Sequence, residues 1–343
     1  MSIKKLFGMV FALLLAGSIT AADVALNQNH PDRHVVVKGD TLWDISSMFL
    51  RDPWLWPEIW YVNPQIANPH LIYPGDILTL VYIDGKPQLR LQRGHPTVRL
   101  APHARVESLD SAIPTIPLDA IKQFLTRPLV VGEDELETAP YVVQSADEHV
   151  VTGAGDRVYV RGIEGTGEAL FDLYEPGGPY IDPDTGEVLG YEALYIGTSA
   201  VQRFGDPATL LLTETTREAR IGHRLRPADR TDPVANFQPH APAPGIEGHI
   251  ISVIDGVSQI GQFNVVAIDL GTRDGIEVGH VLRIFQAGEV VRDIVSDKRG
   301  ETVKLPDEDA GMVMIFRTFE KVSFGLVMKA TRAIHILDYV RTP

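Results

Sequence analysis

The sequence predicts an α+β protein in which a small mixed domain is followed by two β-rich modules. Three observations lead to this fold class. Residues 34–83 show a strand, helix, helix, strand pattern. Residues 97–227 and 245–343 contain short β-branched and aromatic runs separated by Gly, Asp and Pro, which is typical of β-rich units. We interpret 84–96 as a linker or edge segment, and the polar, Pro-rich stretch 228–244 as a second linker.

The first 22 residues have the pattern of a secretory signal. Lys4 and Lys5 form a basic head, residues 6–16 are apolar, and small residues lead to Ala22, after which we expect cleavage. The apolar run is short for a membrane anchor. The sequence therefore predicts export to the periplasm, with no membrane span after cleavage of residues 1–22.

A strand and a helix open the small domain. Residues 35–37 are a run of valines, which favours a strand. Asp40 and Thr41 are good N-cap residues, and the apolar positions after them recur at the helical period. The face that they form holds Leu42, Ile45, Ser46 and Phe49.

A second helix and a closing strand complete this domain. The helix is predicted after Asp52, because Pro53 suits the first helical position. It should end before Pro64, since a residue that precedes proline avoids helical angles. Its apolar face holds Trp56, Ile59 and Trp60. Alternating apolar residues over 77–81 predict the last strand.

The domain contains all four tryptophans of the chain: Trp43, Trp54, Trp56 and Trp60. Most of them should be structural, because a small domain needs large side chains to build a core. The pair around Leu55 has a second interpretation. It could extend a ligand groove or pack against the rest of the chain.

The order of these motifs resembles the LysM domain. The resemblance is carried at the front by 37–45 (VKGDTLWDI), and at the back by 63–66 (NPQI), 68–69 (NP) and 72–76 (IYPGD). LysM domains bind glycans that contain N-acetylglucosamine, chiefly peptidoglycan in bacteria. The resemblance implies a groove between the loop after the first strand and the loop before the last. The ligand contacts that it implies are Gly39, Asp40, Thr41 and Leu42 on one loop, and Asn68, Pro69, Leu71 and Ile72 on the other.

The residues themselves allow two interpretations. Loops rich in Gly, Pro and Asn can present the backbone N–H and C=O groups and the apolar faces that a sugar needs. The same residues also have structural roles, because Asp40 and Thr41 would cap a helix without any ligand, and Pro74 and Gly75 form turns in any protein. The extra aromatic residues Trp54 and Trp56 depart from the commonest LysM pattern.

Both β-rich modules are predicted mainly as strands. In the middle module a short amphipathic helix should contain Ile121, Phe124 and Leu125. Its strands are expected at 141–143, 149–151, 157–160, 194–196 and 208–212. The last module should have strands at 249–254, 263–269, 280–285, 311–316 and 322–328, with 265–268 apolar enough for burial on both faces.

The two modules also show signs of an internal repeat. Residues 155–161 resemble 279–285, and residues 215–227 resemble 330–343. The second pair closes each module. We therefore hypothesise that the modules are related to each other.

Several kinds of site are disfavoured. The chain has no cysteine, which excludes disulfides, thiol catalysis and lipid attachment through a cysteine. The eleven histidines are scattered without metal-ligand spacing, and His30, Asp32 and His34 lie in an expected flexible tail. Residues 182–187 faintly suggest a calcium loop but are better explained as a turn. We expect no catalytic residues, no metal and no cofactor, although cleavage by paired carboxylates is open on composition alone.

The charge balance narrows the partners. A net charge of −14 argues against nucleic acid, which needs a basic footprint, and against anionic lipid surfaces. Removal of residues 1–22 would take away Lys4 and Lys5 and no acidic residue, so the chain would become more acidic still. A weakly charged glycan is compatible with this balance.

The arrangement of the whole chain is similar to a second family, the secretin-associated proteins of type IVa pili. Its tail, 320–340 (EKVSFGLVMKATRAIHILDYV), is similar to the C-terminal domain of a flagellar outer-ring protein, with 319–322 and 330–335 carrying the likeness. The resemblance implies a non-enzymatic periplasmic adaptor. LysM would hold peptidoglycan, and the tail would engage an outer-membrane secretin, with several copies forming a ring. Two alternatives stay open at this point: a peptidoglycan hydrolase or hydrolase activator, and a general structural wall-binding protein.

Overall fold

The computed structural model describes most of the chain in three folded units. The described residues are 24–60, 71–93, 112–116, 129–146, 151–163, 169–228, 237–254, 260–295, 298 and 300–343. The expected signal segment 1–22, the expected helix at 121–125 and residues 229–236 of the expected second linker lie outside them. No helix among the described residues has the length and apolar character needed to cross a bilayer.

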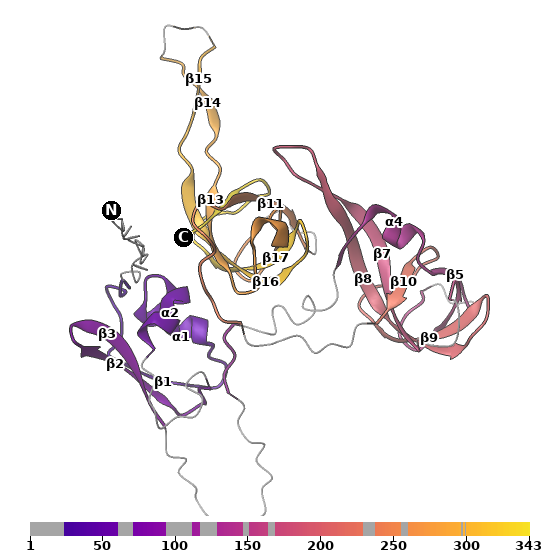
Figure 1. The fold of residues 1–343 in the computed structure, drawn as a ribbon, viewed down its shortest axis with the longest axis horizontal. Coiled ribbons are helices and arrows are strands. Elements are labelled where there is room, and N and C mark those ends of the chain that lie inside the picture. Colours follow the sequence, from indigo (N-terminus) through magenta and orange to yellow (C-terminus); the bar gives the residue numbers. More distant parts are fainter. Residues whose placement is uncertain are drawn as a thin grey trace, which may run out of the picture.

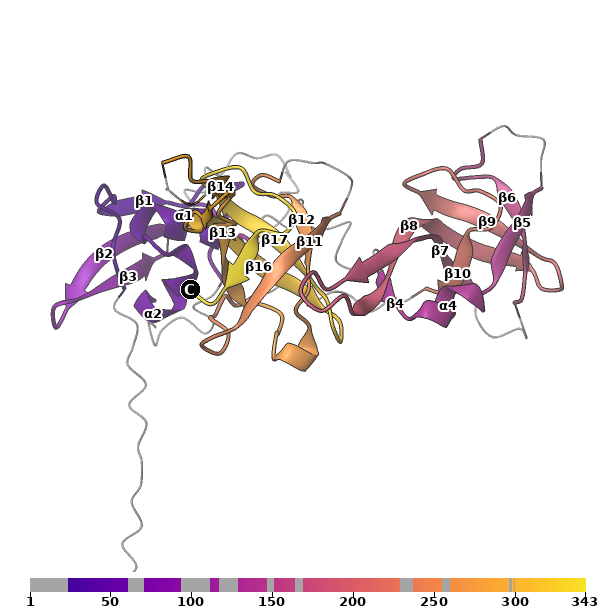
Figure 2. The same cartoon turned by 90° about the horizontal axis from the view of Figure 1, so that it is seen from above.

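The three units lie in a row that does not follow their order in the sequence. The C-terminal unit is in the middle, with the N-terminal unit on one side and the middle module on the other (Figures 1 and 2). The N-terminal and C-terminal units are therefore neighbours in space.

The N-terminal unit packs short helices against a small antiparallel sheet. Its elements are β1 (Arg33–Val35), α1 (Leu42–Phe49), η1 (Pro53–Leu55), α2 (Trp56–Ile59), β2 (Ile77–Ile83) and β3 (Lys86–Gln92). The strand order is β1-β2-β3. The strand, helix, helix, strand pattern expected for this domain is present, and the core contains Trp56 and Trp60 in edge-to-face contact, 5.7 Å between ring centroids.

The second helix is shorter than expected. A 3-10 turn covers Pro53–Leu55, and one helical turn follows over Trp56–Ile59. Pro57 explains the break, because it has no N–H to continue the turn that begins at Pro53, yet suits the start of a new helix. Trp60 is already extended, with φ −75° and ψ 110°.

Of the two interpretations of 84–96, the edge segment agrees with the structure for much of its length, and the linker does not. Lys86–Gln92 forms β3, the edge strand that pairs with the whole of β2. Asp84 and Gly85 make the hairpin turn, both with positive φ, 51° and 77°. Leu89 and Leu91 are buried, 1% and 4% exposed, so alternate residues of β3 extend the core.

The middle module is a closed barrel with an additional edge. Its elements are β4 (Leu129–Val131), α4 (Glu133–Glu137), β5 (Tyr141–Ser145), β6 (Arg157–Arg161), β7 (Leu170–Ile181), β8 (Val188–Arg203), β9 (Ala208–Thr215) and β10 (Arg224–Pro227). The ring runs β5-β6-β9-β8-β7-β10 and returns to β5, closed by the pairing of β8 with β9. Strand β4 pairs with β8 outside this ring.

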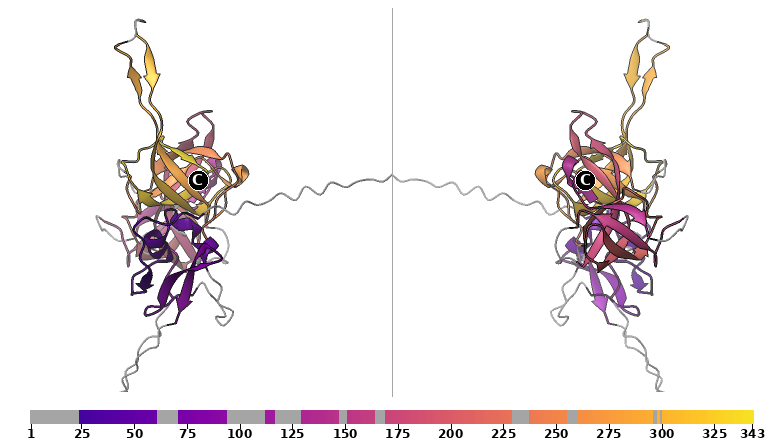
Figure 3. Two further views of the ribbon diagram at one scale, coloured as in Figure 1. Left: turned by 90° about the vertical axis from the view of Figure 1, so that its left-hand side faces the viewer. Right: turned by 90° about the vertical axis from the view of Figure 1, so that its right-hand side faces the viewer.

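The C-terminal unit is a second closed barrel. Its elements are β11 (Glu247–Val253), β12 (Val265–Ile268), η2 (Thr272–Asp274), β13 (Val281–Gln286), β14 (Val290–Arg292), β15 (Thr302–Lys304), β16 (Glu308–Thr318), β17 (Ser323–Ala330) and β18 (Tyr339–Arg341). The ring order is β11-β12-β17-β16-β13-β18. All residues of β12 are buried, as its apolar sequence predicts. Strands β14 and β15 form a separate hairpin that projects from the barrel (Figures 1 and 3).

The two barrels have the same topology. In each, the first strand pairs with the second and the last, and the second pairs with the fifth. The third, fourth and fifth strands pair in sequence, and the third also pairs with the last. The C-terminal barrel adds the β14–β15 hairpin between its third and fourth strands. This shared topology supports the hypothesis that the modules are related.

The shared strand order makes β6 the counterpart of β12, and a turn before each of these two strands then sets the alignment of their residues. Before β6, the Asp156 carboxylate accepts a hydrogen bond from the N–H of Gly153 over 2.8 Å. Before β12, the Asn264 side-chain oxygen accepts one from Gly261 over 2.7 Å. Residues 153–160 therefore correspond to 261–268.

The match of 155–161 with 279–285 is therefore wrong by one strand. Residues 279–285 lead into β13, the third strand of its barrel, whereas 155–161 contain β6, the second. The expected match of the closing segments agrees with the structure. Gly222 donates its N–H to Val142 over 2.8 Å, and Leu337 donates its N–H to Ile250 over 2.7 Å in the same place.

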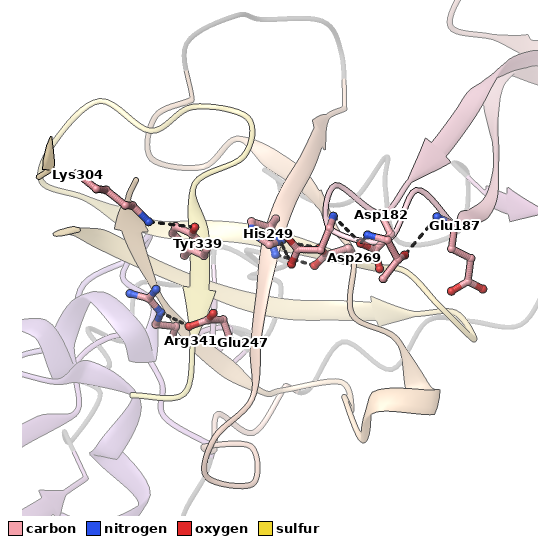
Figure 4. Close-up of polar contacts among 10 residues, drawn as sticks. Asp182, Glu187, Glu247, His249, Asp269, Lys304, Tyr339 and Arg341 are labelled. Atoms are coloured by element: carbon pink, nitrogen blue, oxygen red, sulfur yellow. Dashed lines mark hydrogen bonds and ion pairs between the residues drawn. The ribbon is translucent and has the colours of Figure 1, made fainter. Parts of the chain in front are cut away.

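The long β7–β8 hairpin of the first barrel reaches the second barrel. Glu187, near its tip, lies 2.9 Å from Arg273 and 2.6 Å from Lys321. Tyr180 and Leu189 from the same hairpin are buried in a cluster that continues into the second barrel. Figure 4 shows this tip beside His249 and Asp269.

Candidate functional site

The loop after β1 is held by its own side chains. The Asp40 carboxylate accepts the N–H of Val37 over 3.0 Å and lies 2.8 Å from the ring of His34. Thr41 caps α1, because its hydroxyl accepts the N–H of Asp44 over 3.0 Å and donates to the Asp44 carboxylate over 2.8 Å. The polar side chains of two predicted ligand contacts thus have structural roles, which leaves the backbone as the ligand-facing chemistry of this loop.

Gly39 is required in this loop for its backbone conformation. Its φ of 102° is one that residues with a side chain rarely adopt. No atom lies within 4 Å of the place where a Cβ would be, so the constraint is conformational and not steric crowding.

The loop before β2 is hydrogen-bonded to the end of β1, beside the loop that contains Gly39 and Asp40. Asp76, 4% exposed, accepts the N–H of Tyr73 over 3.0 Å and pairs with Arg93. Val36 donates its N–H to the carbonyl of Asp76 over 2.9 Å and accepts the N–H of Gly75 over 2.8 Å. The end of this loop therefore lies against the end of β1.

The predicted residues of the second loop differ in accessibility. Leu71 is 39% exposed, whereas the side chain of Ile72 is completely buried. Ile72 can therefore contribute only backbone atoms to a ligand. Asn68 and Pro69 lie outside the described residues.

A segment distant in sequence bridges the two loops. The N–H of Ile113 donates to the carbonyl of Ile72 over 2.8 Å. The N–H of Leu42 donates to the carbonyl of Pro114 over 3.0 Å, and the N–H of Trp43 donates to the carbonyl of Thr115 over 3.0 Å. We call the backbone groups of Leu42, Trp43 and Ile72 the interloop site, and residues 112–116 the plug segment.

The plug segment is packed as well as hydrogen-bonded. Ile113, Thr115 and Ile116 are 7%, 3% and 0% exposed. Ile113 belongs to the core of the N-terminal unit, and Ile116 to the cluster that contains Trp43 and continues into the second barrel. This stretch falls within 97–227, the range expected for the middle module, but it packs against the N-terminal unit instead. Its repeated Ile-Pro steps are the signal that favours an extended segment with apolar anchors.

The tryptophans serve packing. Trp43, Trp56 and Trp60 are 3%, 2% and 9% exposed. Trp54 is partly buried and packs against both the core of the N-terminal unit and the cluster of the second barrel. Of the two extra aromatic residues, Trp54 therefore packs against the rest of the chain, whereas Trp56 belongs to the core of the N-terminal unit.

One group of side chains in the described part of the chain has the donor types for a metal. The ligand atoms of His240, Glu277 and His280 lie within 4.8 Å of one another. However, Nδ1 of His280 accepts the N–H of Glu277 over 3.0 Å, which places the proton of the neutral ring on Nε2. Burial lowers the pKa of His280 and so favours this neutral ring. One ring nitrogen of His280 accepts a hydrogen bond and the other carries the proton, so neither has a lone pair left for a metal. His280 therefore acts as a turn residue rather than a metal ligand.

Two acidic positions are explained by local structure. Asp182 accepts the N–H groups of Asp184 and Thr185 over 2.8 and 2.9 Å, and the bond from Thr185 holds the pKa of Asp182 below its usual value. This is the turn favoured over a calcium loop.

The Asp269 carboxylate accepts the backbone N–H of His249 over 2.6 Å and lies 2.9 Å from Nδ1 of the His249 ring (Figure 4). Burial raises the pKa of Asp269. No short-range motif in the sequence indicates this pairing of His249 with Asp269.

Comparison with known proteins identifies the N-terminal unit. Residues 34–81 match the LysM domain family. The chain is also 36% identical over 64 residues to the "Uncharacterized protein YqbP" of Bacillus subtilis (strain 168). That match covers 16% of this chain and 29% of the relative, so this chain spans less than a third of the length of that protein. Residues 34–81 are therefore a LysM domain, a class of domain that binds glycans containing N-acetylglucosamine, and the rest of the described chain is β-rich.

Proposed function

We propose that this protein is a non-enzymatic periplasmic adaptor that binds peptidoglycan through its LysM domain and anchors an outer-membrane secretin of a type IV pilus machine. The observation that carries the first half is the interloop site. The N–H groups of Leu42 and Trp43 belong to the first turn of α1, the carbonyl of Ile72 belongs to the loop before β2, and all three lie within hydrogen-bond distance of the short backbone stretch 113–115. Backbone donors and an acceptor of this kind can bind the amide and hydroxyl groups of an amino sugar.

The same loops support binding without catalysis. Cleavage of a glycan requires a free carboxylate pair or another general acid and base beside the bond. Near the interloop site, the carboxylates of Asp40, Asp44 and Asp76 accept hydrogen bonds from the turns of the domain itself. The proposed ligand contacts that the structure describes are Gly39, Asp40, Thr41, Leu42, Leu71 and Ile72.

The second half of the proposal concerns the barrels. The likeness of the tail to secretin-associated proteins supports it, together with the β14–β15 hairpin, which stands clear of the barrel (Figure 3). Val290, Ile294 and Val295 on this hairpin are 66%, 87% and 87% exposed. Exposed apolar side chains on a projecting strand pair suit a protein partner. Several copies around a secretin ring would bind the wall with avidity, even if one LysM domain binds weakly.

Binding to the wall is tested by sedimentation with purified peptidoglycan. Leu71 and Ile83 are both 39% exposed in the same domain, so their substitutions are matched. We expect Leu71→Glu to reduce the sedimented fraction, because it puts charge beside the interloop site, and Ile83→Glu to leave it unchanged. Equal effects of the two variants would contradict the placement of the site.

Binding to the secretin is tested by co-purification under mild extraction. Ile294→Asp together with Val295→Asp should reduce recovery of the secretin. Ile221→Asp is the control, because Ile221 is 67% exposed on the other barrel. Normal recovery of the secretin with the hairpin variant would rule out the hairpin as its docking element.

A further inference from the structure

The interloop site is already occupied by the protein itself. The plug segment takes up the N–H of Leu42, the N–H of Trp43 and the carbonyl of Ile72, which are the groups that a glycan would use. A backbone N–H satisfied by one carbonyl cannot make a second good hydrogen bond to a sugar. Peptide and sugar therefore compete for the same atoms.

We propose that the plug segment is an intramolecular inhibitor that closes the LysM domain and must leave before glycan binds. This inference rests on the proposed function, since it concerns the regulation of the same site. The closed state is held by three backbone hydrogen bonds and by the buried side chains of Ile113 and Ile116. The open state exposes these isoleucines and frees the interloop site.

The covalent link between plug and domain sets the strength of the competition. A segment attached to its site acts at an effective concentration in the millimolar range. A short free oligosaccharide at low concentration competes poorly with such a segment. Assembled wall must displace the same segment, so the plug lowers the affinity for wall and for fragments by the same factor, which is set by the closed fraction of the domain.

Ile116 couples the plug to the second barrel. Its side chain is completely buried in the cluster that contains Trp43 and residues of the barrel such as Phe324 and Leu326. Asp52 of the LysM domain, 2.7 Å from Arg283 of β13, provides a second contact between these two units. A partner that shifts the barrel relative to the LysM domain would thus loosen the plug, and binding of glycan would by reciprocity loosen that contact.

The test compares affinities for peptidoglycan and for a hexamer of N-acetylglucosamine in the full chain. Ile113→Asp with Ile116→Asp places charge at two buried positions and should expel the plug. Ile113→Pro is a milder second variant, because it removes the N–H that donates to Ile72 and shortens the side chain without adding charge, and Ile113→Val is its control for the shortened side chain. Ile221→Asp controls for added charge at an exposed position of the first barrel.

We expect both opening variants to bind hexamer and wall at least about tenfold more tightly, because the competent state is no longer a minor population. The two controls should bind like the unmodified chain. Unchanged affinity in folded opening variants overturns the inference and leaves the proposed function intact. Absence of binding by every form, including the opened ones, overturns the proposed function as well. Circular dichroism checks the fold, and if the double variant does not fold, Ile113→Pro decides.

Discussion

The carboxylate of Asp52 lies 2.7 Å from the guanidinium of Arg283, which joins the LysM domain to the C-terminal barrel. Asp52 precedes η1, and Arg283 is on β13. The guanidinium of Arg283 also forms an ion pair with Asp309 over 2.7 Å. The Asp52 side chain is 11% exposed, so this ion pair is shielded from water far more than a surface pair. The coupling energy of this ion pair therefore measures whether the LysM domain and the C-terminal barrel behave as one body.

A double-mutant cycle should detect this coupling. All four tryptophans lie in the LysM domain, and Trp43 and Trp54 also contact the cluster of the barrel, so tryptophan fluorescence during urea unfolding reports on that domain and on its contact with the barrel. We expect Asp52→Asn and Arg283→Gln each to destabilise it, with a coupling energy of about 1–3 kcal/mol between them. Arg161 and Asp206, more than half exposed on the other barrel, form the control pair and should not change this transition. A coupling energy near zero for the first pair would show that the domain unfolds independently of the barrel.

Asp76 should be important for the stability of the LysM domain. Its buried carboxylate accepts the N–H of Tyr73 and pairs with Arg93, so Asp76→Ala leaves both groups without their acceptor. We expect a loss of about 1–3 kcal/mol in the free energy of unfolding, measured by tryptophan fluorescence. Glu58→Ala is the control, because Glu58 is exposed on α2 and should change stability by less than about 0.5 kcal/mol. Equal effects would contradict the role given to the turn before β2.

Two equivalent glycines should be intolerant of a methyl group. Gly197 in β8 pairs with Thr215, and Gly311 in β16 pairs with Ala330, the same position in the two barrels. A Cβ at Gly197 would meet the carbonyl oxygen of Glu214, and one at Gly311 would meet that of Lys329.

Gly197→Ala and Gly311→Ala should each destabilise their barrel, by about 1–3 kcal/mol or more, because the clash is with backbone. Circular dichroism during thermal unfolding provides the measurement. Gly178→Ala is the control, since Gly178 has open space around the position of a Cβ. If one barrel tolerates the change and the other does not, the close approach is not a shared feature of the repeat.

Acid should weaken both barrels through two buried histidines. Nδ1 of His223 accepts the N–H of Arg220 over 3.2 Å, as Nδ1 of His280 accepts that of Glu277. Burial lowers the pKa of both rings from the ordinary value of 6.5. The unfolded chain therefore binds protons that the folded chain does not, and the stability present above pH 6.5 is lost as pH falls toward the folded pKa values.

Unfolding experiments across this pH range test that statement. His223→Asn and His280→Asn keep a side-chain acceptor but do not titrate, so the double variant should lose less stability on acidification than the unmodified protein. His335→Asn is the control, because His335 is exposed. A pH dependence that is the same in all three forms would assign the acid sensitivity to other groups.

Local features of the fold were predictable, because short-range chemistry determines them. Thr41 caps a helix, and Gly75 lies in a turn with positive φ, as their sequence context predicts. Apolar runs also located most strands of both barrels. Closure of the barrels was not predictable, since the pairing of β6 with β9 or β13 with β18 depends on contacts between strands that are distant in the sequence.

The phase of the repeat was missed for a physical reason. A turn with a side-chain acceptor precedes the second strand in each barrel, at Asp156 and Asn264. The same turn also precedes the third strand of the second barrel, with His280 as acceptor. A turn that recurs before different strands cannot show by itself which strands correspond.

The plug segment is the part of the candidate site that could not be predicted from the sequence. The LysM loops could be predicted, because their motifs lie at short spacing in the chain. Residues 112–116 bind those loops through backbone atoms, which carry no sequence signature, and through two isoleucines that resemble those of any apolar segment. Only the folded chain brings Ile113 to Ile72.

The most direct test of the central claim is hydrogen exchange at the backbone N–H of Ile113 in the unmodified protein, with and without a hexamer of N-acetylglucosamine. This N–H donates to the carbonyl of Ile72 in the closed state, so it should exchange slowly in the absence of sugar. We expect exchange at Ile113 to accelerate as the hexamer saturates the LysM domain, because the sugar displaces the plug segment. Slow exchange at Ile113 while the hexamer is demonstrably bound would contradict the account, since sugar and plug would then occupy the domain together.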